Sequence, residues 1–266
     1  MYTWNWEPGL LIALALLLGG YLLCAAGPLR RLFPGTGNAS ALEIQLFVLG
    51  WLSLFIALVS PIDTLSGWSL SMHMVQHILV TLIAPPLLLL GTPSWLLQPI
   101  ARVPLAVRAG RYITGPIFAF LLFNIVFTAW HVPANYNLAL TDLHVHILEH
   151  AMFFAAAVIA WWPVFSPIDE IPRAHPLAQT AFLFFQALPS TILGAIIAFA
   201  PEPLYPHYTT APRLWGMTVM DDQQLAGLIM WVPASLIYFG VLTIVFLRWL
   251  NRDDRDPEPY AHRTTP

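Results

Sequence analysis

The sequence predicts an all-α, polytopic membrane protein, a bundle of seven transmembrane helices with the N-terminus outside and the C-terminus cytoplasmic. Apolar residues make up 58% of the 266 positions and charged residues only 9%, against roughly 25% charged residues in soluble domains. The apolar residues fall into runs of about 20, the length that crosses a hydrocarbon core. Backbone groups in lipid must form hydrogen bonds within their own segment, so these runs are expected to be helices.

Seven apolar runs follow one another, each bounded by proline, glycine or charge, where helices usually end. The expected spans are Leu10 to Ala26, Leu42 to Ser60, Leu70 to Leu90, Ile113 to Trp130, His146 to Val164, Ala178 to Phe199 and Leu225 to Leu250. The first run has no basic residue before it, so it is expected to be retained rather than cleaved as a signal peptide. Residues 1–250 therefore form one membrane domain, and the charged residues 251–266 are expected to be a disordered cytoplasmic tail.

The arginines set the expected orientation, because short cytoplasmic loops carry the positive excess. All 11 basic residues are arginine. Ten lie in the odd-numbered loops and the C-terminal tail, and Arg213 alone lies on the other side. This asymmetry places the N-terminus outside in a multi-pass protein of the cell inner (plasma) membrane.

Composition also excludes several classes of function. A net charge of -3 without any lysine argues against a nucleic-acid partner. The single Cys24 allows neither an intramolecular disulfide nor a thiolate zinc cage, so a bound metal needs other ligands. Glycine-rich phosphate loops and serine nucleophile elbows are also absent, so we expect no enzyme. His146 to His150 does have the His-x-x-Glu-His order of one metallopeptidase class, but the chain lacks a clear downstream acidic ligand.

Two His-x3-His pairs are the main indication of a site. His73 and His77 lie in the third span, and His146 and His150 lie in the fifth. Positions i and i+4 share one helix face, so each pair can chelate one ion. Both pairs lie at a similar depth near the outer side, which lets the two helices face each other through their histidines.

Further polar and thioether groups gather on the same side. The full set of candidate metal ligands is His73, His77, His131, His146, His150, Met72, Met74, His144, Glu149 and Asp222. Imidazole with thioether suits copper, particularly Cu(I), better than magnesium or calcium. The simpler interpretations are an interfacial hydrogen bond for a single histidine, core packing for a single methionine and a helix cap for Asp222.

Prolines interrupt three of the spans. Ala84-Pro85-Pro86 is expected to kink the third span and to free carbonyls that a neighbouring helix must satisfy. Pro189 and Pro233 are expected to have the same effect in the sixth and seventh spans.

At the level of whole motifs the sequence resembles the CtaG family of polytopic cytochrome c oxidase assembly factors. The motifs that carry the resemblance are Met72-His73-Met74-Val75-Gln76-His77, Ala84 to Gly91, Trp130-His131-Val132-Pro133 with Tyr136-Asn137, His146 to His150, Trp161-Trp162-Pro163, Asp222 to Gly227 and Met230 to Pro233. The resemblance implies an assembly factor for a haem–copper oxidase that helps to supply copper to the active-site copper centre. Oxidase subunits and the lipid bilayer are the implied partners, and a homo-oligomer is left open.

Two other functions compete with copper handling. In a haem b protein, histidines from two helices, such as His77 and His150, would ligate the iron axially. A copper permease would need ligands that continue through the inner halves of the spans, where the chain offers mainly Cys24, Gln186 and Asn124.

The predicted orientation can be tested with reporters fused after Pro266. We expect a cytoplasmic reporter to be active there and an export-dependent reporter to be silent, because ten of the 11 arginines lie on that side. A fusion at Pro266 that is active only outside the cytoplasm would contradict the orientation.

Overall fold

The structure is a computed structural model that describes residues 3–33 and 37–253. Six helices in these residues are long and apolar enough to cross a membrane. They are α1 (Pro8–Ala25), α2 (Ala41–Leu58), the continuous segment Leu70–Leu90, α10 (Leu143–Phe165), α11 (Pro176–Phe199) and α13 (Val219–Asp253). The predicted all-helical membrane bundle is therefore confirmed.

The fourth expected span differs from its prediction. It was expected to run from Ile113 to Trp130, but Ile113 is the last residue of α7 (Pro104–Ile113), and α8 (Pro116–His131) begins after a bend of 66°. Pro116 occupies the first turn of α8, where its missing N–H and fixed φ favour a helix start. The bundle has seven spans if this bent pair is taken as one.

The C-terminal boundary also differs. Helix α13 continues through residues 251–253, which the sequence assigned to the tail. The rest of that expected tail, residues 254–266, lies outside the described residues.

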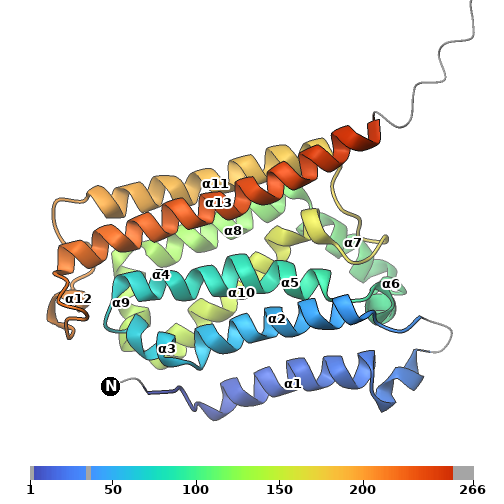
Figure 1. Cartoon of the computed structure of the whole chain (residues 1–266), viewed down its shortest axis with the longest axis horizontal. Helices are drawn as coiled ribbons and strands as arrows, with labels where there is room; N and C mark the ends of the chain where they lie inside the picture. Colours follow the sequence, from blue (N-terminus) through green and yellow to red (C-terminus); the bar gives the residue numbers. More distant parts are fainter. Residues whose placement is uncertain (1–2, 34–36, 254–266) are drawn as a thin grey trace, which may run out of the picture.

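Shorter helices connect the spans. These are the 3-10 turns η1 (Pro28–Leu32) and η3 (Ser94–Leu97), with α3 (Pro61–Ser66), α6 (Gln98–Ala101), α9 (Pro133–Thr141) and α12 (His207–Thr210). In Figure 1, α11 and α13 lie along one edge, α1 forms the opposite edge, and α4, α5 and α10 run between them.

The central segment consists of α4 (Leu70–Ile78), the π-helical turn η2 (Leu79–Ile83) and α5 (Ala84–Leu90). In the most apolar 18-residue stretch of this segment 61% of the residues are buried, against 17% in α1. The reason is that α2, α10 and α13 all pack against the central segment. Residues on this segment are therefore placed in the middle of the bundle.

The sequence predicts that Pro85 and Pro86 interrupt the regular α-helix. The structure shows this interruption as the π-helical turn η2, which directly precedes the two prolines. Pro85 has no N–H to donate to the carbonyl of Thr81, four residues earlier. The indole Nε1 of Trp161, on α10, donates to that carbonyl at 2.9 Å, and the Ser53 hydroxyl donates to the carbonyl of Leu79 at 3.0 Å. Trp161 thus satisfies the carbonyl that Pro85 leaves free, as predicted, whereas α11 and α13 stay continuous through Pro189 and Pro233.

Helices α11 and α13 approach each other closely at two glycines. A Cβ on Gly227 would overlap the carbonyl oxygen of Gly194 and the backbone of Ala198. Small residues at such a crossing let two membrane helices pack backbone against backbone. The position of α13, and with it the position of its first turn, depends on this contact.

We predict that Gly227→Ala lowers the stability of the folded bundle by roughly 1–3 kcal/mol, because the methyl group must push two backbones apart. Thermal unfolding of the purified protein in detergent measures this. Gly240→Ala in the same helix is the matched control, since a Cβ there meets nothing within 4 Å. Equal melting temperatures for the two variants would contradict the close-packing argument.

Candidate metal centre

Helix α4 places two imidazoles on one face in the core. His73 is 0% exposed and His77 is 5% exposed. Their Nε2 atoms lie 2.7 Å apart, as the four-residue spacing allows. One ion can therefore be reached by both side chains.

Helix α10 brings the second pair and a carboxylate to the same place. Glu149 is fully buried, and its Oε1 lies 3.8 Å from the Nε2 atoms of both His73 and His77. The ring of His150 lies 5.7 Å from that of His77 and 4.4 Å from that of His146, between centroids. The two His-x3-His pairs thus converge across α4 and α10.

A fifth imidazole comes from the end of α8. The ring of His131 lies 5.8 Å from that of His77 and is 4% exposed. We call these six residues, His73, His77, His131, His146, Glu149 and His150, the histidine cluster. Helices α4 and α10 and the C-terminal end of α8 supply these residues.

Hydrogen bonds prepare two of the rings for ligation. The Nδ1 atoms of His131 and His150 lie 2.7 Å and 3.1 Å from the backbone carbonyls of Phe127 and His146. A carbonyl can only accept, so Nδ1 carries the proton and Nε2 presents its lone pair. Outer hydrogen bonds of this kind orient metal-binding histidines in proteins.

Several buried polar atoms of the cluster have no hydrogen-bond partner among the residues that the structure describes. These are Nδ1 of His73 and His77, Nε2 of His131, His146 and His150, and both carboxylate oxygens of Glu149. Buried polar groups are normally hydrogen-bonded, and an uncompensated buried carboxylate is costly. The arrangement therefore fits a bound cation.

Glu149 belongs to two potential ligand sets. His73, His77 and Glu149 form one, and His146, Glu149 and His150 form the other, with the ligand atoms of each set within 4.8 Å of one another. Imidazole and carboxylate ligands suit transition metals such as copper, zinc, iron and nickel. Small movements of the side chains toward a common centre would complete either set.

Buried tyrosines close one side of the cluster. The ring of Tyr136, on α9, lies 4.9 Å from that of His73, and its hydroxyl lies 2.9 Å from that of Tyr208. Tyr205 donates to the carbonyl of His131 at 2.9 Å. Burial raises the pKa of Tyr136 and Tyr208 well above the usual value, so both phenols stay neutral and keep their protons.

The other candidate ligands lie elsewhere. Asp222, predicted as a ligand, instead caps α4: its carboxylate accepts from the backbone N–H groups of Leu70 and Ser71 and from the hydroxyls of Ser69 and Ser71. Such an anion at a helix N-terminus is stabilised by the helix dipole. Asp222 therefore holds the helix that carries His73 and His77 rather than joining the cluster.

His144 is exposed at the start of α10, and Met72 is half-buried on α4. Met74 is buried and lines a small cavity of about 30 Å³ together with His77, His131 and Met230. That volume suffices for a single water or ion. Thioethers thus border the cluster on the side that faces α13.

Sequence reasoning had not singled out Met230, Tyr205 or Tyr208 as part of this region. Met230 has the spacing of an ordinary core residue, and the two tyrosines lie in a connection with no periodicity. Only the fold shows that they surround the cluster.

Comparison with known proteins supports one family. The model of the family described as cytochrome c oxidase caa3 assembly factors matches residues 19–252. Uncharacterised proteins of Mycobacterium bovis and Mycobacterium tuberculosis are each 25% identical over 235 residues, covering 78% of this chain, and one of Mycobacterium leprae is 22% identical over 237 residues. The chain spans only 34–35% of the length of these relatives, and no solved structure matches.

We predict that Asp222→Ala destabilises the protein by roughly 2–4 kcal/mol, because it leaves several buried donors without an acceptor. Thermal unfolding measures the effect. Asp221→Ala is the matched control, since exposed Asp221 accepts hydrogen bonds from Thr218, the residue just before its own helix. A loss for Asp222→Ala no larger than that for Asp221→Ala would refute the capping role.

Proposed function

The chain belongs to the family of cytochrome c oxidase caa3 assembly factors, and from this premise we propose that it binds copper in the histidine cluster and aids its insertion into the oxidase. The observation that carries the proposal is the set of buried, unpartnered atoms on five imidazoles, four of them on buried side chains, and on one buried carboxylate. A buried site of this composition in a membrane bundle is costly to maintain and is typical of function.

The ligand types favour copper among the metals of the cell. Magnesium and calcium prefer oxygen ligands, and structural zinc sites usually include cysteine thiolates, whereas here imidazole nitrogens predominate. Imidazole suits copper, and the thioethers of Met74 and Met230 beside His77 and His131 would suit Cu(I). The membership of this family indicates that a cytochrome c oxidase is the protein that accepts the copper.

The proposed cargo would be held by neutral imidazoles and by Glu149. Nε2 of His131 and His150 is ready to donate a lone pair, and the Glu149 carboxylate balances part of the cation's charge. The surrounding helices and tyrosines keep water away. A site without thiolates binds copper less firmly than a cysteine site does, which suits later release to an acceptor.

The haem alternative meets an obstacle in the same geometry. A porphyrin between His77 and His150 needs a flat, open slot, but Oε1 of Glu149 lies 3.8 Å from Nε2 of His77 and the ring of His73 lies 6.2 Å from that of His150. The visible spectrum of the purified protein distinguishes the two proposals. A Soret band that is lost with His77→Ala would favour haem, and colourless protein with stoichiometric copper favours the assembly factor.

The permease alternative lacks support in the inner half of the bundle. Asn124 donates to Gln186 at 3.2 Å, so these two amides bond to each other across α8 and α11. We propose that the cluster lies at the outer side of the plasma membrane, because ten of the 11 arginines lie on the opposite, cytoplasmic side.

We predict that a His77→Ala, His150→Ala double variant loses bound copper while the bundle stays folded, because the apolar faces of the spans supply most of the packing. Metal analysis of purified protein after dialysis measures the copper, and circular dichroism checks the fold. His175→Ala is the matched control, because it changes an exposed histidine at the N-cap of α11, which is not part of the cluster. Wild-type copper content in the double variant would refute the site.

In cells we expect the double variant to be as abundant as wild type, and the oxidase to contain haem but to lack active-site copper and activity. Added copper should restore activity in part if the factor raises local supply. Full oxidase activity in cells carrying the double variant would show that oxidase assembly does not require these histidines.

A further inference from the structure

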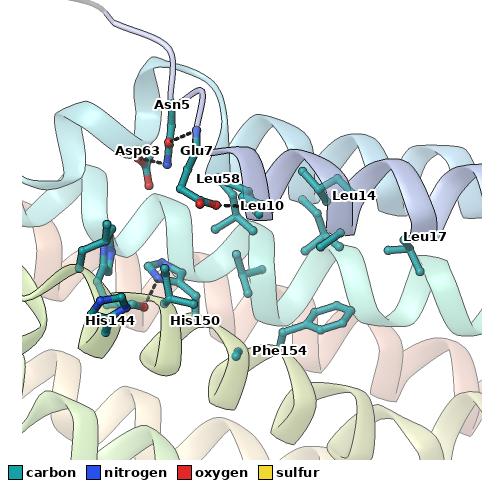
Figure 2. A pocket seen from close by; sticks show the side chains of 18 residues that line it. Asn5, Glu7, Leu10, Leu14, Leu17, Leu58, Asp63, His144, His150 and Phe154 are labelled. Atoms are coloured by element: carbon teal, nitrogen blue, oxygen red, sulfur yellow. Dashed lines mark hydrogen bonds between the residues drawn. The ribbon is translucent and has the colours of Figure 1, made fainter.

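A second feature lies next to the histidine cluster. A partly open cavity of about 580 Å³ lies between α1, α2 and α10. Figure 2 shows that its polar side chains, among them Asn5, Glu7 and Asp63, gather at one end, while Leu17 and Phe154 lie toward the other. The cavity is thus divided into a polar end and an apolar remainder.

The cavity reaches the cluster through two of its members. His146 and His150 line it, whereas the other four cluster residues do not form its wall. His150 is 8% exposed, and its Nε2 has no protein partner. On the remaining sides of the cluster, His73, Glu149 and Tyr136 are fully buried. Beside His77 and His131 the cluster borders a cavity of only about 30 Å³, so the 580 Å³ cavity is the wider approach for an ion.

The polar end carries the charge that a cation needs. Glu7 and Asp63 contribute carboxylates, and no arginine is found among the described residues that line the cavity. Asp63 accepts hydrogen bonds from Asn5 at 3.0 Å and from Gln76 at 2.9 Å, which fix its carboxylate in place. Gln76 is the residue before His77, so the same network extends to the cluster helix.

Three imidazoles of α10 mark successive depths along this end. His144 is exposed at the rim, His146 is half-buried, and His150 is buried in the cluster. Each also lines the cavity. An aquated cation can therefore exchange water for imidazole nitrogen in steps.

We propose that the polar end of this cavity is the entrance through which a transition-metal cation passes from water, along His144, His146 and His150, into the histidine cluster. This inference rests on the proposed function and deepens it, because it states how the cargo arrives. The carboxylates of Glu7 and Asp63 raise the local cation concentration. The apolar remainder offers no ligand, so the route is confined to the polar end.

The test measures how fast Cu(II) loads into metal-free protein, followed by the quenching of tryptophan fluorescence in a stopped-flow instrument. A Glu7→Gln, Asp63→Asn double variant should load roughly tenfold more slowly at low ionic strength, because charged clefts accelerate the binding of ions. The difference should shrink in high salt, which screens the carboxylates. Asp169→Asn, an exposed acidic site in another loop, should load at the wild-type rate.

A second variant blocks the passage without changing any charge. Ala151→Trp places a large ring in the cavity beside His150, and it should slow loading at every salt concentration. Ala155→Trp, one turn further along α10 and outside the cavity wall, is the matched control and should load normally. Final copper stoichiometry should equal that of wild type in all four variants.

The outcomes separate the two proposals. Wild-type loading rates in both the double variant and Ala151→Trp would overturn the entrance while leaving the copper site intact. A lower final stoichiometry in the carboxylate variant at an unchanged rate would also overturn it, because Glu7 or Asp63 would then act as a ligand. Wild-type protein that binds neither Cu(II) nor, under reducing conditions, Cu(I) would overturn the proposed function itself.

Discussion

The burial of Glu149 among five histidines is the constraint on which the rest of the structure depends. Its carboxylate is fully buried, and neither oxygen has a hydrogen-bond donor within residues 3–33 and 37–253. In a bundle with so few charges, such a group needs a positive partner, because its transfer from water into an apolar core is otherwise prohibitive. The surrounding imidazoles can act as neutral metal ligands, which supports our proposal that the partner is a cation that binds and leaves.

Contacts outside the histidine cluster hold the helices that carry it in position. Asp222 on α13 holds the N-terminus of α4, and Gly194 and Gly227 let α13 lie close enough against α11 to do so. Below the histidines, Trp161 of α10 bonds to the carbonyl that Pro85 leaves free. The two segments that face each other through the histidine cluster are thus joined both by the side chains of the cluster and by a hydrogen bond to the backbone.

Much of this could be predicted from the sequence because it follows local periodicity. Apolar runs gave the spans, and the i, i+4 spacing with matched depth gave the convergence of His73, His77, His146 and His150. The role of Asp222 could not be predicted, because its partners Leu70 and Ser71 lie about 150 positions earlier in the chain. Tyr205, Tyr208 and Asp63 escaped notice for a similar reason, since irregular connections and short helices carry no period that shows where a side chain will be placed.

X-ray absorption spectroscopy of the copper-loaded protein tests the central claim most directly, because it reports the atoms bound to the metal. The account predicts the outer-shell scattering of several imidazole rings around one class of copper, reduced when His77 and His150 are replaced by alanine. Copper surrounded only by oxygen, or a spectrum identical in wild type and in that variant, would contradict it.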